Sequence, residues 1–271
     1  MPAPDSNAPL PVVLTIAGSD CSSGAGLQAD LKTFSTHGTY GLTVVTCIVS
    51  EIPGKVSQIQ AATPEIVGDQ LRILLGGFPI AALKTGMLFS KEIITEVAAI
   101  LSALPPEKRP KLVIDPVMIA TSGDPLLQSD AVEAYETLLF PLADVITPNM
   151  DEAAALLGNK ISSVAELAPA AAALHAKYGC SVLLKGGHLC GSDAVDVLHT
   201  VAETYEFTAP FIPDVSTHGT GCTYAAAITA RLAQGHPLPE AVRLAKNFVT
   251  SAIAQSFKWG SVHALNHFVQ P

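Results

Sequence analysis

The sequence predicts an α/β fold built on a mainly parallel sheet. Apolar residues make up 49% of the chain and aromatic residues only 6%, a balance that favours buried aliphatic strands over an all-β sandwich. Short β-branched runs alternate with amphipathic stretches of helical period. The 271 residues are within the range of one α/β domain, so we expect a single domain at 10–271 after a flexible tail at 1–9.

The first half of the chain alternates between strands and helices. A β-branched run from residue 12 is followed by a Gly/Ser-rich turn and then by an amphipathic stretch. Strands separated by helices imply right-handed crossovers between parallel neighbours. The expected strands are 12–17, 42–50, 81–85 and 112–115, and the expected helices are 27–37, 64–75 and 91–104.

The second half continues this alternation and then changes near residue 194. Two alternating runs, at 194–200 and 203–207, predict an antiparallel hairpin at the sheet edge. The last two helices present apolar residues to the core. The remaining elements are helices at 129–139, 164–178, 224–232 and 239–255, and strands at 145–147 and 181–185.

Charge and cysteine usage exclude several classes of protein. The net charge is −9 with only 15 Lys and Arg, so no basic surface for nucleic acid is expected. The N-terminus lacks a basic segment and no apolar run reaches the length of a membrane span, so we expect a cytoplasmic protein. The five cysteines are widely spaced, which indicates neither a disulfide framework nor a zinc site.

A glycine turn precedes an Ala-rich helix near the C-terminus. Thr217 is followed, after one residue, by Gly219, Thr220, Gly221 and Cys222. Glycines allow successive N–H groups to converge, and the helix adds positive potential, so the turn predicts an anion hole for a transferring phosphoryl group. Cys222 at the helix start is expected to have a lowered pKa and to act as a base. The alternative is a small buried residue in a helix cap.

Polar residues follow three of the expected strands. Lys185 ends one strand, Asp115 ends another, and Asn149 and Glu152 follow a third. Ligand sites of open α/β sheets lie at the carboxyl ends of strands, so Lys185 is expected to bind nucleotide phosphates. The oxygens of the other three suit Mg²⁺. For Asn149 and Glu152, a helix cap is an equally good interpretation.

The loop after the first strand, residues 18–30, is rich in small side chains. It lacks the Gly-x-x-x-x-Gly-Lys-Ser/Thr phosphate loop and the third glycine of the dinucleotide fingerprint, which argues against a dinucleotide oxidoreductase. Such a loop can instead let a flat ring approach the backbone, with Asp30 accepting a hydrogen bond from a substrate hydroxyl. The alternative is that Asp30 only lies in the first turn of a helix.

Taken together, these segments resemble the hydroxymethylpyrimidine and phosphomethylpyrimidine kinases of thiamine biosynthesis, which belong to the ribokinase superfamily and are related to pyridoxal kinases. The resemblance covers nearly the whole chain in family order, and it implies a three-layer α/β/α sandwich. It rests on seven segments: 17–20, 24–34, 84–88, 115–118, 146–149, 185–188 and 217–223.

The resemblance implies that ATP phosphorylates 4-amino-5-hydroxymethyl-2-methylpyrimidine and then its monophosphate. Cys222 would be the base beneath the anion hole, and a homodimer would be the assembled state. The residues implied for Mg-ATP are Asp115, Asn149, Glu152 and Lys185. The residues implied for the pyrimidine site are Gly18, Ala25, Asp30, Met87 and Val117.

One departure from the family pattern bears on specificity. Glu51 replaces a glutamine that would meet the pyrimidine edge. Ionised glutamate only accepts hydrogen bonds, whereas glutamine also donates, so the substrate is either retained with altered affinity or changed to a related ring. The alternatives are a pyridoxal or pyridoxine kinase and, in a different class, a non-catalytic sensor that binds a pyrimidine or a nucleotide.

Overall fold

The computed structural model describes residues 9–118, 129–187, 193–213, 215 and 218–271. Within these ranges, nine strands form one sheet in the order β3-β2-β1-β4-β5-β6-β7-β8-β9, and two short strands form a separate hairpin. The predicted tail at 1–9 lies, except for its last residue, outside the described residues. No helix in the described ranges combines the length and the apolar character that crossing a membrane requires.

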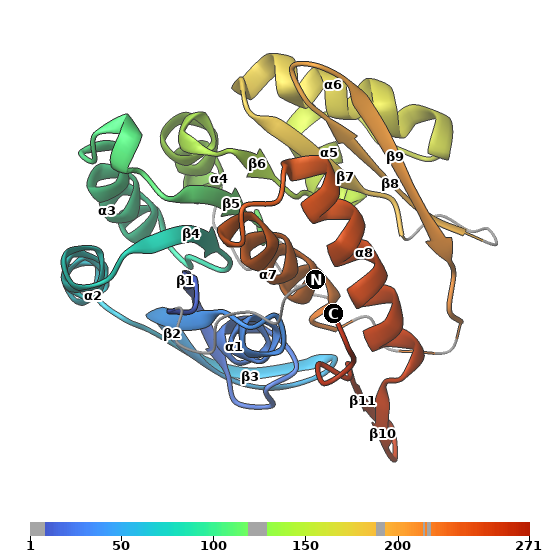
Figure 1. Ribbon diagram of the computed structural model, residues 1–271, viewed down its shortest axis with the longest axis horizontal. Helices are drawn as coiled ribbons and strands as arrows, with labels where there is room; N and C mark the ends of the chain where they lie inside the picture. The colour runs from blue at the N-terminus through green and yellow to red at the C-terminus, as the bar shows by residue number, and fades with distance from the viewer. Residues whose placement is uncertain (1–8, 119–128, 188–192, 214, 216–217) are drawn as a thin grey trace.

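The elements follow the predicted alternation (Figure 1). The strands are β1 (Val12–Asp20), β2 (Tyr40–Ile52), β3 (Lys55–Ala61), β4 (Ile80–Thr85), β5 (Lys111–Ile114), β6 (Val145–Ile146), β7 (Ser181–Lys185), β8 (Asp193–His199), β9 (Thr204–Pro210), β10 (Phe257–Trp259) and β11 (Val262–Ala264). The helices are α1 (Gly26–Thr36), α2 (Pro64–Gly77), α3 (Lys91–Ser102), α4 (Ser129–Ala134), α5 (Met150–Leu157), α6 (Leu167–Tyr178), α7 (Thr220–Ala233) and α8 (Leu238–Ala254).

The sheet is parallel in its centre and antiparallel at both edges. Strands β2, β1, β4, β5, β6 and β7 are parallel neighbours. The predicted hairpin of β8 and β9 is confirmed at one edge. At the other edge, β3 pairs with β2 in an antiparallel ladder that the sequence did not predict. The side chains of β3 are exposed or half-buried, so the alternation of apolar and polar residues along it is too weak to predict a strand.

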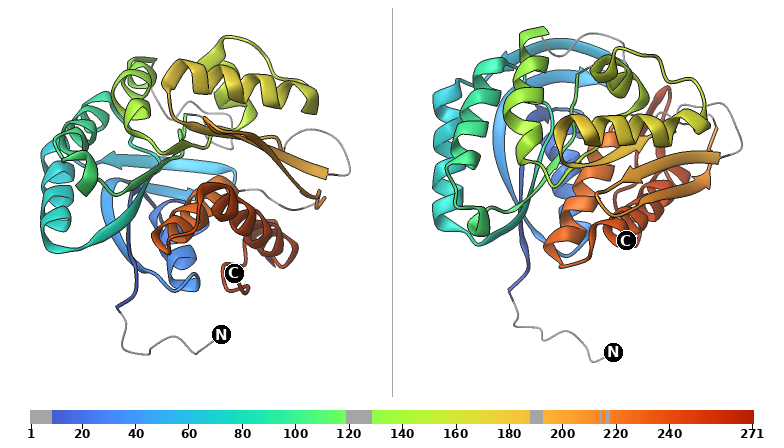
Figure 2. Two further views of the ribbon diagram at one scale, coloured as in Figure 1. Left: turned by 45° about the horizontal axis from the view of Figure 1, so that its top comes forward. Right: turned by 90° about the horizontal axis from the view of Figure 1, so that it is seen from above.

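Helices cover both faces of the sheet (Figure 2). The larger apolar core joins one face to α2, α3, α4, α5 and α6. The other face is covered by α1, α7 and α8, which pack on apolar side chains of the central strands. The result is the expected three-layer α/β/α sandwich.

Local signals explain where several helices begin. Thr63 and Ser90 accept hydrogen bonds from the N–H groups of Ile66 and Ile93, so α2 and α3 begin where the sequence predicts. The helix predicted at 224–232 begins earlier, at Thr220. The residues of the predicted anion hole are therefore part of the first turn of α7. The helix predicted at 129–139 continues from α4 into a π-helical turn at Tyr135–Leu139.

Because aliphatic side chains are buried between α3 and the sheet, truncation of a buried valine should lower the free energy of unfolding far more than truncation of an exposed one. Val97 is fully buried in the larger core, whereas Val201 in the β8–β9 turn is 91% exposed. Val97→Ala should lower the free energy of unfolding by about 2 kcal/mol, from lost transfer energy plus the cavity left behind. Val201→Ala should change it by less than about 0.5 kcal/mol. Urea unfolding measures both values, and equal effects would contradict this packing.

Candidate active site

A cavity of ≈ 470 Å³ lies at the carboxyl edge of the parallel strands. Five neighbouring strands, β1, β4, β5, β6 and β7, end at this edge, and a residue at or just after the end of each strand lines the cavity. In sheet order these lining residues are Asp20, Met87, Asp115, Asn149 and Lys185.

The cavity brings together most of the residues that the sequence predicts for a site. Those that line it are Gly18, Ala25, Glu51, Met87, Asp115, Val117, Asn149, Glu152, Lys185, Gly219, Thr220, Gly221 and Cys222. Asp30 is not among the lining residues. Thr217 lies outside the described residues.

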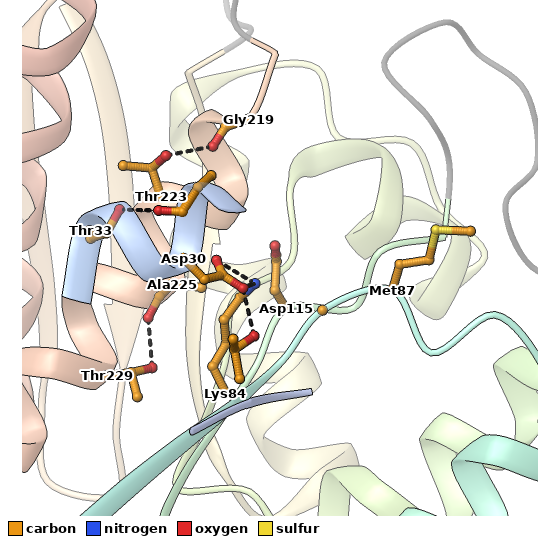
Figure 3. A network of polar contacts seen from close by, with 12 residues as sticks. Asp30, Thr33, Lys84, Met87, Asp115, Gly219, Thr223, Ala225 and Thr229 are labelled. Atoms are coloured by element: carbon orange, nitrogen blue, oxygen red, sulfur yellow. Dashed lines mark hydrogen bonds and ion pairs between the residues drawn. The ribbon is translucent and has the colours of Figure 1, made fainter. Parts of the chain in front are cut away.

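The start of α7 has the glycine-dependent geometry that the sequence predicts. Gly219 has a φ of 79°, in the left-handed region, and a β-carbon there would collide with the carbonyl oxygen of Gly24. The Thr223 hydroxyl donates to the Gly219 carbonyl at 2.8 Å (Figure 3), which holds the turn against the helix. The free N–H groups of the first helical turn therefore face the cavity with the positive end of the helix dipole.

The predicted lowering of the Cys222 pKa is wrong. Burial raises the pKa of this thiol to about 11, because desolvation outweighs the attraction of the Lys84 ammonium. The carboxylates of Asp30 and Asp115 add to the increase. The helix N-terminus was the only influence visible in the sequence, and the neighbouring carboxylates come from other elements. The thiol is half-buried at the cavity wall and is protonated at neutral pH.

Lys185 and Asp115 form an ion pair on the cavity wall. Lys185 Nζ lies 3.0 Å from Asp115 Oδ1, which also accepts a hydrogen bond of 3.2 Å from Thr147 Oγ1. Although burial disfavours the ammonium, the carboxylates of Asp115 and Glu152 hold the pKa of Lys185 above its ordinary value. A β-carbon on Gly221 would lie 3.3 Å from Lys185 Nζ, so the missing side chain brings this cation close to the anion hole.

Asn149 and Glu152 form a helix cap, which was one of the two roles that the sequence allowed for them; the other was binding of Mg²⁺. The Asn149 side chain accepts from the Glu152 N–H at 2.9 Å, and the Glu152 carboxylate accepts from the Asn149 N–H at 2.8 Å. Burial raises the pKa of Glu152 to about 7, against the attraction of Lys185. The cap does not remove either residue from the site, because both also line the cavity.

The prediction that Asp30 contacts a substrate hydroxyl is not supported by its position. Its side chain is fully buried, and Lys84 Nζ donates to its two carboxylate oxygens at 3.0 and 2.9 Å. Thr15 Oγ1 donates a further hydrogen bond at 2.6 Å. The pair joins α1 to β4 (Figure 3), and neither residue lines the cavity. The sequence could not indicate this arrangement, since Lys84 is 54 residues away along the chain.

Asp20 organises the loop between β1 and α1, a role that the sequence pattern did not indicate. Its carboxylate accepts from the backbone N–H groups of Ser22, Gly24 and Ala25 at 2.7–3.0 Å. Although burial opposes ionisation, these bonds and His218 hold the pKa of Asp20 below its ordinary value. His218 Nε2 lies 3.4 Å from Asp20 Oδ2, so the loop is joined to the residue that precedes Gly219.

Glu51 lies near Asp20 at the same end of the cavity. Its carboxyl is half-buried and receives no hydrogen bond from the described residues. Desolvation raises its pKa, the charge of Asp20 raises it further, and His218 opposes the increase. A carboxyl in this position is available to a ligand.

A second buried ion pair on the cavity wall was not predicted either. Lys246 Nζ on α8 lies 2.6 Å from Asp196 Oδ2 on β8, and the Gly186 N–H donates to the other Asp196 oxygen at 3.0 Å. The two partners are 50 residues apart, and each occupies an ordinary position of its own strand or helix. Only the folded arrangement identifies them as neighbours.

Comparisons with known proteins identify the family of this chain. The family model of phosphomethylpyrimidine kinase matches residues 20–267. The hydroxymethylpyrimidine/phosphomethylpyrimidine kinase of Streptomyces coelicolor is 42% identical, over 96% of this chain and 95% of that protein. The thiamine biosynthesis bifunctional protein ThiED of Geobacter sulfurreducens is 44% identical over 95% of this chain but only 52% of its own length, so the chain spans about half of that relative.

Among solved structures, the pyridoxal kinase of Staphylococcus aureus in complex with AMP-PCP and pyridoxal is similar, with a TM-score of 0.87 and 37% identity. The match covers 96% of this chain and 94% of that one. The expected ribokinase-like fold is confirmed by this likeness. With a family model that spans most of its length, the chain belongs to the phosphomethylpyrimidine kinase family.

Proposed function

We propose that this protein is an ATP-dependent kinase that phosphorylates 4-amino-5-hydroxymethyl-2-methylpyrimidine and then phosphorylates the monophosphate to the diphosphate. The observation that carries this proposal is one cavity lined by two chemically different groups of residues. Gly18, Met87 and Val117 give it small or apolar walls. Lys185 gives it a cation close to Gly221, at the start of α7.

In the first step, the hydroxymethyl oxygen attacks the terminal phosphorus of ATP and ADP leaves. The N–H groups from Gly219 to Cys222 would stabilise the charge on the transferring group. The alcohol proton would pass to the Cys222 thiolate. The thiolate is a minor species at neutral pH because of the raised pKa, but for the same reason it is a strong base once formed. The second step starts from an anionic phosphate oxygen and needs no such base.

The nucleotide would lie toward Lys185, with Asn149 beside it. Thr217, which lies outside the described residues, is a further candidate for binding the nucleotide. Asp115 and Glu152 are the proposed ligands of the Mg²⁺ that accompanies ATP. Two buried carboxylates fit this ion, which takes one or two carboxylates and completes its shell with phosphates and water. Among the described residues no group of three or more acidic, His or Cys side chains is arranged to hold a metal alone, which agrees with an ion that arrives with the nucleotide. When bound, Mg²⁺ would neutralise phosphate charge.

The family resemblance supports two further proposals, a homodimer and a cytoplasmic location. Light scattering coupled to size-exclusion chromatography measures the first directly, and a mass of one chain would contradict it. Cell fractionation measures the second.

A substrate panel tests the proposed activity. Purified protein with Mg²⁺ and ATP is offered hydroxymethylpyrimidine, its monophosphate and pyridoxal in parallel, and the products are identified by mass. We expect turnover of both pyrimidines and little turnover of pyridoxal. The likeness to a solved pyridoxal kinase makes preference for pyridoxal the second candidate function. ATP-dependent turnover of none of the three would favour a non-catalytic sensor.

Removal of the base should separate the two steps. Cys222→Ala should lower kcat for the alcohol about 100-fold or more, the usual contribution of a general base, and should affect the monophosphate much less. Cys180→Ala, which removes a buried thiol outside the cavity lining, is the matched control and should leave the ratio of the two rates unchanged. Equal losses for both substrates in Cys222→Ala would contradict the role of the base.

Glu51 should make substrate binding depend on pH. A protonated carboxyl donates from its hydroxyl and accepts at its carbonyl, as an amide does, so it can meet the ring nitrogen and amino group of an aminopyrimidine together. As the pH rises through the raised pKa of Glu51, the donor is lost and the KM for the pyrimidine should increase. Glu51→Gln cannot ionise and should flatten this increase of KM with pH.

The control is Glu133→Gln, which removes one carboxyl from the exposed surface of α4. Its KM profile should follow that of the wild-type protein. If Glu51→Gln retains the full wild-type increase of KM with pH, the contact between Glu51 and the ring is refuted.

A further inference from the structure

Lys84 and Asp30 form a fully buried ion pair to which the proposed reaction assigns no role. Both side chains have 0% exposure, and Lys84 Nζ contacts both oxygens of Asp30. Thr15 on β1 completes the contacts of the carboxylate. Burying two charges costs several kcal/mol per ion, and well-packed apolar residues of similar volume are often at least as stabilising. Fold stability alone therefore gives little reason for charges at this point.

The pair lies on two elements, α1 and β4, that both pack against the helix carrying the proposed base. The N–H of Gly26, at the start of α1, donates to the Cys222 thiol, and Asp30 follows Gly26 by one helical turn on the same face of α1. Strand β4 carries Lys84 and packs against α7, which carries Cys222. Asp30, on the second turn of α1, contacts the ammonium of Lys84 on β4 (Figure 3).

We propose that Lys84 is a positioning residue that supplies the counter-charge for the Cys222 thiolate, and that Asp30 and Thr15 hold its ammonium in place. This inference rests on the proposed role of Cys222 as the base. Because burial disfavours the thiolate, a fixed cation on a neighbouring element is the group that favours its formation.

Charged groups on four elements act on the thiol. Lys84 on β4 and Lys185 on β7 favour the thiolate, while Asp30 on α1 and Asp115 after β5 oppose it. Lys84 exerts the largest effect of the charged groups on Cys222, greater than that of Asp30. Burial disfavours the Lys84 ammonium, but the negative groups around it, Asp30 first, hold its pKa above the ordinary value, so it stays charged.

The test measures ionisation of Cys222 without any substrate. The rate of alkylation by iodoacetamide is followed from neutral to strongly alkaline pH by peptide mass analysis, with exposed Cys21 on the same protein as the internal reference. In Lys84→Met, the profile of Cys222 should move to higher pH. If the pKa of the thiol rises by about 1, alkylation below that pKa should become about tenfold slower.

Lys84→Met leaves Asp30 buried without its partner and can destabilise the fold, so a second variant is decisive. Asp30→Asn/Lys84→Met has no unpaired charge. It removes both the effect of Lys84, which favours the Cys222 thiolate, and the smaller effect of Asp30, which opposes it. The Cys222 profile should therefore still move to higher pH, but by less than in Lys84→Met. The control Lys177→Met breaks an ion pair with Glu136 on the surface and should leave the profile unchanged. A wild-type profile in the folded double variant would overturn the proposal.

The substrates then separate this proposal from the proposed function. A displaced alkylation profile together with selective loss of alcohol phosphorylation supports both. If the variants have a displaced alkylation profile but the wild-type protein turns over none of the tested substrates, the counter-charge is supported and the kinase activity is refuted. Turnover of both pyrimidines by the wild type, with a wild-type alkylation profile in the double variant, refutes the counter-charge alone.

Discussion

The close approach of two loops is the constraint on which the site depends. The carbonyl of Gly24, before α1, lies where a side chain of Gly219, before α7, would have to be. Because neither residue carries a side chain, the N-termini of α1 and α7 converge on the same wall of the cavity. The starts of two helices then lie at one place in the cavity wall, which neither helix could provide alone.

Three buried pairs of lysine and aspartate surround this convergence. Lys185–Asp115 and Lys246–Asp196 are on the cavity wall, whereas neither residue of Lys84–Asp30 lines the cavity. Each pair joins residues at least 50 positions apart, so each connects a different pair of elements. Since buried ion pairs contribute little net stability, their main effect is to fix the position and charge of groups around the cavity.

Local patterns predicted the fold and most of the site. The alternation of strands and helices, together with the rule that ligand sites lie at the carboxyl ends of parallel strands, was sufficient to place Lys185, Asp115 and Asn149 in one cavity. Glycines at 219 and 221 indicated the anion hole because a turn of this kind has few other uses next to a helix.

The errors came from interactions between distant residues. The pKa of Cys222 depends on Lys84, Asp30 and Asp115, which belong to other elements, so the direction of its change could not be judged from the helix N-terminus. Asp30 lies in the second turn of α1, and its fully buried contact with Lys84 could not be inferred from the sequence. Strand β3 pairs with the second half of β2, a contact that its weak apolar alternation did not indicate.

The order of elements along the chain affects when the protein becomes complete during synthesis. Strand β1 emerges first, yet it lies between β2 and β4, and the face that it shares with β5 to β7 is covered by α7 and α8, which emerge last. The nascent chain therefore holds one finished layer of helices while the opposite apolar face is covered only by α1 and is otherwise open to solvent and to chaperones. The proposed anion hole belongs to this last layer, so a ribosome-bound chain that stops before residue 219 has a sheet and a cation at its edge but lacks the start of α7 that the proposed reaction requires.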